Sequence, residues 1–248
     1  MAWRERANQA VEDALGGSAR AGWAPQLGVI AGLPKGSRVL KRLHTSRDVE
    51  DLKDVLAEVR IGLCLVGQGF EVSIEPHGEA GPDLGAVRGG IDAVVEVCRL
   101  RSVYEDLDIE ELERHPDMLP PMGDTQRDLR RMRAKIIGKF RQLDCSEPSI
   151  LAVWNDQDCM IEGEAKTVVH QIAVDASHDG VPPPQNMEFV VYGSPWVSCR
   201  NQQQFYTYSH QMTTSECMVA WRHEWEASRV GELVRDALRL ALPPSAPV

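Results

Sequence analysis

Two acidic residues, Asp83 and Glu96, lie on either side of a glycine pair in the segment GPDLGAVRGGIDAVVEVCRL (81–100). Gly89 and Gly90 favour a two-residue hairpin turn, which would place Asp83 directly opposite Glu96 on the neighbouring strand. Opposed carboxylates repel each other and lower stability unless a cation lies between them. The pattern therefore predicts that Asp83 and Glu96 bind a divalent metal ion.

Cys98 is expected in the same patch, because side chains on a strand alternate in direction and Cys98 follows Glu96 by two positions. Simpler interpretations of this hairpin remain open. The carboxylates can lie on an ordinary solvated face, since a shift of one residue in register separates them. The Cys98 thiol can be a small packed side chain, or a nucleophile with His77 or His170 as its base.

Helices and strands around this hairpin must position its side chains. Apolar residues three and four apart predict an amphipathic helix that begins near Ser46 or Asp48 and ends near Gly67-Gln68-Gly69. The other expected elements are strands at 70–74, 82–87, 91–100, 149–154 and 187–193 and helices at 125–143 and 224–242. The segment 149–154 is too apolar for an edge strand and is expected to be buried and central. This order predicts an α/β fold with a mixed central sheet flanked by helices.

Basic side chains are concentrated in the expected helix 125–143, although the whole chain has a net charge of −10. Such a helix is predicted to contact phosphate groups of nucleic acid, which supplies affinity without reading the base sequence. The predicted contacts are Arg127, Arg130, Arg131, Arg133 and Lys135. Alternatively, the basic face is solvated and forms ion pairs with the acidic run at 105–113.

Residues 48–154 resemble the PD-(D/E)XK nuclease superfamily, in which an Asp after Pro and an acidic residue two positions before a Lys bind Mg²⁺ from adjacent strands. The matching residues are Pro82-Asp83 and Glu96-Val97-Cys98. The resemblance implies a restriction-endonuclease-like core in which Asp83 and Glu96 hold Mg²⁺ or Mn²⁺. It also implies that Glu58, from the first helix, holds or orients the water on that metal.

One position departs from the family pattern, because Cys98 stands where the superfamily has its Lys. A neutral thiol cannot position the attacking water or offset charge on the phosphate. Lys139 or Arg133 of the following helix could supply the cation, and Gln142 could orient a water. The chain is thus interpreted as a metal-dependent nuclease acting on DNA or RNA. The alternative is a catalytically degenerate nuclease fold that binds nucleic acid or a protein.

A single domain is predicted for the 248 residues. Its expected parts are an N-terminal extension (1–45), the nuclease-like core (46–155), and additional strands with a C-terminal helix (156–248). Within the extension, we expect a helix over 3–15 and short strands near 27–31 and 37–43. Aromatic and amide-rich residues of the C-terminal third could stack on bases or pack against the sheet.

The cysteine pattern and the hydropathy indicate the compartment. Six cysteines without close pairing favour a reducing environment. No stretch reaches the roughly 20 apolar residues that cross a bilayer, and the first residues lack the apolar core of a signal peptide. We therefore expect a cytoplasmic protein without membrane contact. Nucleic acid is its expected partner, with a protein partner or a second copy as further possibilities.

Overall fold

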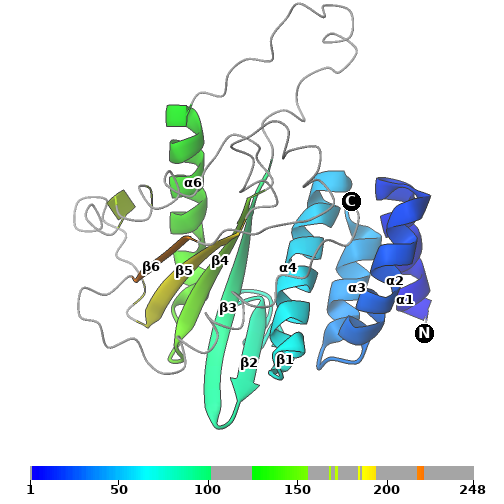
Figure 1. The fold of residues 1–248 in the computed structure, drawn as a ribbon, viewed down its shortest axis with the longest axis horizontal. Coiled ribbons are helices and arrows are strands. Elements are labelled where there is room, and N and C mark those ends of the chain that lie inside the picture. The colour runs from blue at the N-terminus through cyan, green and yellow to red at the C-terminus, as the bar shows by residue number, and fades with distance from the viewer. Residues whose placement is uncertain are drawn as a thin grey trace, which may run out of the picture.

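The computed structural model describes residues 2–101, 125–155, 168, 171–172, 184, 186–193 and 217–220. In this part of the chain, six strands form one mixed sheet with helices on both faces (Figure 1). The helices are α1 (Ala2–Leu15), α2 (Gly17–Ala31), α3 (Gly36–Thr45), α4 (Val49–Gly67) and α6 (Thr125–Lys139), which continues into the 3₁₀ turn η2 (Phe140–Leu143). The strands are β1 (Glu71–Ile74), β2 (Leu84–Arg88), β3 (Ile91–Leu100), β4 (Ser149–Asn155), β5 (Met187–Gly193) and β6 (Cys217–Ala220). The predicted α/β class with a mixed sheet is confirmed.

The strands lie in the sheet in the order of the chain. The pairs β1–β2, β2–β3 and β5–β6 are antiparallel, whereas β4 is parallel to both of its neighbours, β3 and β5. Ile150 and Leu151, which face opposite sides of β4, are both fully buried. The prediction of a buried central strand at 149–154 is therefore confirmed. The strand is apolar because both of its faces are covered by other parts of the protein.

The hairpin of β2 and β3 has the predicted register. Arg88 pairs with Ile91 and Leu84 pairs with Val95. Gly89 and Gly90 have φ angles of 62° and 80°, the left-handed conformation that a tight hairpin turn needs and that glycine adopts without a steric penalty. The next position along the hairpin places Asp83, just before β2, beside Glu96 in β3.

Helix α4 begins and ends where its sequence indicates. The Asp48 side chain caps it by accepting a hydrogen bond from the backbone N–H of Asp51 at 2.8 Å, so Asp48 rather than Ser46 is the cap. Its apolar residues at spacings of three and four, such as Leu52, Leu56 and Val59, are buried. The buried stripe fixes α4 against the sheet.

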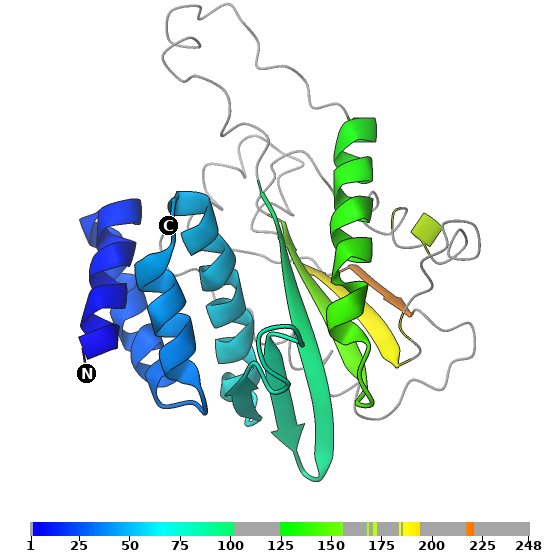
Figure 2. The same ribbon diagram turned by 180° about the vertical axis from the view of Figure 1, so that it is seen from behind.

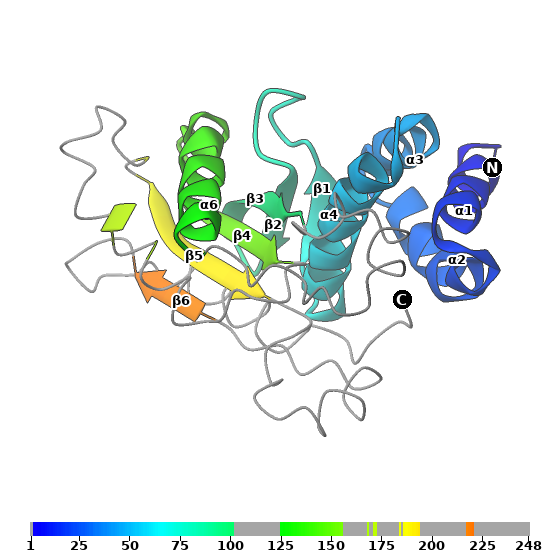
Figure 3. The same cartoon turned by 90° about the horizontal axis from the view of Figure 1, so that it is seen from above.

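Two hydrophobic clusters cover the two faces of the sheet. Val95 and Val97 of β3 join the cluster that contains α4, whereas Cys98 and Leu100 join the cluster that contains α6. The α6 cluster includes Met132, Ile136, Phe140 and Leu143, the stripe expected for this helix. Seen from above, β3 passes between α4 and α6 (Figure 3). Side chains of both helices can therefore reach the part of β3 that carries Glu96.

The expectation of strands near 27–31 and 37–43 was wrong, because both segments are helical, in α2 and α3. The buried residues Trp23, Leu27 and Ile30 recur at helical spacing and outweigh the glycines and Pro25 of this segment. Helices α1, α2 and α3 pack beyond α4 (Figure 2) and share its hydrophobic cluster, so the segment expected as an extension contributes to the core. None of the helices described here is long and apolar enough to cross a membrane.

Several expectations concern residues outside the described ranges. They are the acidic segment 105–124, His170, the helix over 224–242 and most of the aromatic C-terminal third. The strand expected at 187–193 is described and is β5, with the expected bounds.

Candidate active site

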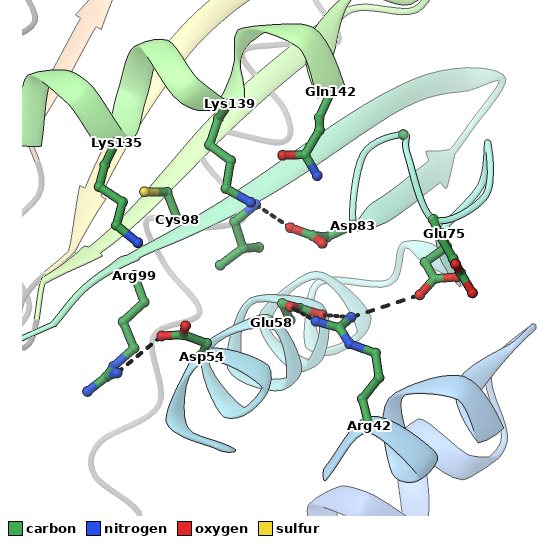
Figure 4. Close-up of a pocket in the computed structure, with 13 residues that line it drawn as sticks. Arg42, Asp54, Glu58, Glu75, Asp83, Cys98, Arg99, Lys135, Lys139 and Gln142 are labelled. Atoms are coloured by element: carbon green, nitrogen blue, oxygen red, sulfur yellow. Dashed lines mark hydrogen bonds and ion pairs between the residues drawn. The ribbon is translucent and has the colours of Figure 1, made fainter. Parts of the chain in front are cut away.

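A cavity of about 500 Å³ opens between α4, α6 and the start of β2 (Figure 4). It is lined by Arg42, Asp54, Glu58, Glu75, Glu79, Gly81, Asp83, Val97, Cys98, Arg99, Lys135, Lys139 and Gln142. Four residues of the predicted site, Glu58, Asp83, Cys98 and Lys139, line it. A fifth, Glu96, lies directly behind the lining and contacts Asp83 and Lys139.

Asp83 and Glu96 are fastened to each other's strands by hydrogen bonds. The backbone N–H of Asp83 donates to Glu96 Oε2 at 3.1 Å, and the backbone N–H of Val97 donates to Asp83 Oδ2 at 2.8 Å. Glu96 is completely buried, with 0% of its surface exposed. The hairpin therefore brings the two carboxyl groups together and fixes their orientation, and the simpler picture of two solvated side chains does not hold.

Glu58 reaches the same cavity from the middle of α4. Arg42 of α3 donates two hydrogen bonds to the Glu58 carboxylate, from Nη1 to Oε2 at 2.7 Å and from Nη2 to Oε1 at 2.6 Å. Such a two-point pair fixes both the position and the plane of the carboxylate. Sequence reasoning missed Arg42 because it placed this segment in a strand. The helical spacing of Val39 and Leu43 was the available signal.

Lys139 supplies a cation from the last turn of α6. Its ammonium Nζ lies 2.5 Å from Glu96 Oε1, and its side chain is directed toward Asp83 (Figure 4). Gln142, one turn further, also lines the cavity. The structure thus places a lysine beside the two carboxylates, although from α6 and not from the strand position that Cys98 occupies.

Burial and mutual repulsion strongly raise the pKa values of the acids in the cavity. Burial, together with repulsion from Asp83, raises the pKa of Glu58 to about 8 although Arg42 and Lys139 oppose the shift. The same two causes raise the pKa of Glu96 to about 8 against the attraction of Lys139. Burial also raises the pKa of Asp83. Burial lowers the pKa of Lys139, but attraction by Glu96 and Asp83 outweighs it and the net shift is upward. Three acids that lie this close together favour the binding of an added cation.

These shifts predict that the metal-free protein loses stability as the pH rises. The folded state keeps protons on Glu58 and Glu96 up to about pH 8, whereas the unfolded chain releases them near 4.5. The stabilisation is complete below the pKa that these acids have in the unfolded chain, and it is lost as the pH rises through their pKa in the folded protein. The free energy of unfolding should therefore fall by about 2 kcal/mol or more across this range. Urea denaturation in EDTA at several pH values measures it. The variant with Glu58→Gln and Glu96→Gln should flatten the curve, and a stability that rises over this range would contradict the assignment.

The residues present fit Mg²⁺ or Mn²⁺ through a small number of carboxylate oxygens. Among the described residues, no three His, Cys, Asp or Glu side chains are arranged to hold a metal ion together. Mg²⁺, however, usually keeps several waters and is held by only one or two carboxylates. The Asp83 side chain lines the cavity, and the Glu96 carboxylate lies beside it. These two residues are the ones that could hold the metal.

Cys98 is buried, with 1% of its surface exposed, and packs in the cluster under α6. Burial raises the pKa of its thiol to about 11, so the thiol stays protonated near neutral pH. His77, one base considered for it, instead pairs with Glu147, with 3.1 Å between Nε2 and Oε1. The geometry therefore favours packing over nucleophilic chemistry for Cys98.

The predicted phosphate contacts on α6 are only partly gathered at the cavity. Lys135 lines it, whereas Arg130, Arg131 and Arg133 do not. The side chain of Arg127 is outside the described part of the structure. Lys135 lies four residues before Lys139 and therefore shares its face of α6, whereas Arg131 lies one further turn toward the start of the helix.

Further lining residues were not anticipated. Arg99 of β3 has a side chain that is only 1% exposed, and its Nη1 lies 2.6 Å from Glu50 and 3.1 Å from Asp54. Glu75 directly follows β1 and has a φ of 46°. Its carboxylate Oε2 lies 2.5 Å from Nη1 of Arg38. A left-handed backbone at a residue other than glycine is uncommon and is often found at functional sites.

Comparison of this chain with protein-family models, with curated proteins and with solved structures gave no match in any of the three.

Proposed function

We propose that this protein hydrolyses phosphodiester bonds of DNA or RNA with the help of Mg²⁺ or Mn²⁺. The observation that carries the proposal is the meeting of Glu58, Asp83 and Glu96 with Lys139 at one cavity. Carboxylate oxygens are the ligands that these cations prefer, and a nearby ammonium group can offset charge on a phosphate. Both groups can lower the barrier to hydrolysis of a phosphate diester.

The order of elements also supports the proposal. Helix α4, strands β1 to β3, helix α6 and strand β4 follow one another in the order on which the resemblance of residues 48–154 to the PD-(D/E)XK nucleases rests. The difference from that superfamily, Cys98 in place of Lys, is offset by Lys139, because its ammonium group pairs with Glu96 from the neighbouring helix. We therefore favour a restriction-endonuclease-like core with a displaced lysine.

The roles of the residues follow from their positions. Asp83 and Glu96 would hold the metal, which when bound lowers the pKa of water and offsets charge on the phosphate. Glu58, oriented by Arg42, would accept a hydrogen bond or proton from the attacking water, and Gln142 would help to orient it. Lys139 would stabilise the negative charge that grows on the phosphate oxygens. The water oxygen forms the new bond to phosphorus, the bond to the leaving sugar oxygen breaks, and a proton passes to that oxygen.

Charge balance favours a bound cation when a phosphate enters the cavity. The lining contains five carboxylates (Asp54, Glu58, Glu75, Glu79 and Asp83) and four basic side chains (Arg42, Arg99, Lys135 and Lys139). Glu96 behind it adds a further acid. When Glu58 and Glu96 are ionised, a phosphate would enter a cavity of net negative charge, and a divalent cation removes that obstacle.

A second candidate function is binding without catalysis. The observation in its favour is that Lys139 already pairs with Glu96, the acid that a metal would need. In this alternative, the nuclease-like fold keeps its basic residues to bind nucleic acid or a protein and no longer holds a metal. Metal binding separates the two candidates.

The test uses the purified protein, labelled DNA and RNA, and Mg²⁺ or Mn²⁺. We expect cleavage that depends on the added metal and stops in EDTA, and heat released on titration of Mn²⁺ into the protein. Metal binding without cleavage of either nucleic acid would contradict the hydrolase. Neither metal binding nor cleavage, with retained binding of nucleic acid, would favour the second candidate.

A further inference from the structure

The two walls of the cavity differ in charge. Helix α6 and turn η2 contribute Lys135, Lys139 and Gln142, which are basic or neutral (Figure 4). The carboxylates that line the cavity come from α4 and from the segment 75–83 before β2. An anionic ligand is therefore attracted to the α6 wall, while a metal ion is attracted to the opposite one.

Lys135 differs from the other basic residues of the cavity. Arg42, Arg99 and Lys139 each pair with a carboxylate. Among the residues that the structure describes, Lys135 has no ion pair or hydrogen-bond partner, and its side chain is exposed. Its positive charge is thus available to an anion that enters the cavity.

The spacing on α6 suits a repeated anion. Lys135 and Lys139 are four residues apart, which places them on one face of the helix with Cβ atoms about 5–6 Å apart. Gln142 extends the row by three residues in the same direction. This separation, together with the reach of a lysine side chain, matches two successive phosphates of a nucleic-acid strand.

We infer that the substrate is a nucleic-acid strand that runs along α6, with the phosphate to be cleaved at Lys139 and the neighbouring phosphate at Lys135. The inference rests on the proposed function and narrows it. A mononucleotide or a phosphate monoester would leave Lys135 without a ligand. Because lysines contact phosphates and not base edges, the strand is held without reading its sequence at these positions.

The experiment compares the Lys135→Ala variant with the unmodified protein on two substrates, in Mg²⁺. One is a single-stranded oligonucleotide, tested as DNA and as RNA, and the other is bis(p-nitrophenyl) phosphate, a diester with a single phosphate. We expect the KM for the oligonucleotide to rise about tenfold and the slope of log KM against log salt to decrease by about one. The rate with the small diester should stay unchanged. Lys41→Ala removes an exposed lysine of α3 outside the cavity and should leave the cleavage of both substrates unchanged.

Each outcome decides a different claim. If Lys135→Ala cleaves the oligonucleotide with an unchanged KM and salt slope, the strand inference is wrong and the hydrolase proposal stands. If the unmodified protein cleaves neither substrate, the hydrolase proposal is wrong, and fluorescence anisotropy of the oligonucleotide decides the inference. Binding that is about tenfold weaker in Lys135→Ala supports it. Binding that is unchanged in Lys135→Ala, or absent in the unmodified protein, overturns it.

Discussion

The Asp83→Asn variant is expected to lose metal-dependent cleavage by about a thousandfold or more while becoming more stable than the unmodified protein in EDTA. Asparagine keeps an oxygen that can accept the 2.8 Å hydrogen bond from the Val97 N–H. It removes the charge that the metal needs, about 4 kcal/mol of transition-state stabilisation for a thousandfold loss. It also removes the repulsion that raises the pKa values of Glu58 and Glu96.

The gain in stability distinguishes a functional carboxylate from a structural one. We expect the free energy of unfolding at pH 8 to rise by about 1 kcal/mol, the energy of roughly one pKa unit. Urea denaturation measures this, and cleavage of a labelled oligonucleotide measures activity. Asp92→Asn is the matched control, because Asp92 is exposed on the same hairpin. Retained cleavage in Asp83→Asn, or a loss of stability in that variant, would contradict the site.

The Lys139→Met variant should lose both activity and stability. Removing the ammonium group at 2.5 Å leaves the fully buried Glu96 carboxyl without its cation. Loss of one partner of a buried ion pair commonly costs about 3–5 kcal/mol, and protonation of Glu96 should limit the cost here to about 2–3 kcal/mol. Cleavage should fall by about a hundredfold to a thousandfold, the usual effect of deleting a group that stabilises transition-state charge.

A second substitution separates the two effects of Lys139→Met. Adding Glu96→Gln removes the unpaired acid, so the double variant should recover most of the lost stability but none of the activity. The stability loss should also be smaller near pH 5 than at pH 8, because the folded protein then holds Glu96 protonated. Full activity in Lys139→Met would show that this lysine is not the cation of the site.

The hairpin shows how far local sequence information reaches. The glycine pair determines the turn, the turn determines the register, and the register opposes Asp83 and Glu96 across strands that adjoin in the chain. The amphipathic stripes of α4 and α6 were equally legible, because helical spacing and the Asp48 cap are local signals. All of these expectations were confirmed.

The error at residues 17–45 has an identifiable cause. Glycines and Pro25 suggested loops and short strands, and the apolar residues were too few in each short window to settle the period. Packing against α4 decided for helices, since three helices together bury Trp23, Leu27 and Leu43 in one cluster. As a consequence, Arg42 was missing from the predicted site, because a residue that is assigned to the wrong element cannot be matched with its partner.

The amino-acid sequence by itself determined the α/β class, the hairpin and its pair of carboxylates, because these depend on turn chemistry and on periods that span a few residues. Only the tertiary structure decided that α3 and α4 deliver Arg42 and Glu58 to one side of Asp83, and that α6 delivers Lys139 to Glu96. These contacts join positions far apart in the chain. They arise because each helix buries its apolar stripe on a particular face of the sheet, and the polar residues beside that stripe are carried to the cavity with it.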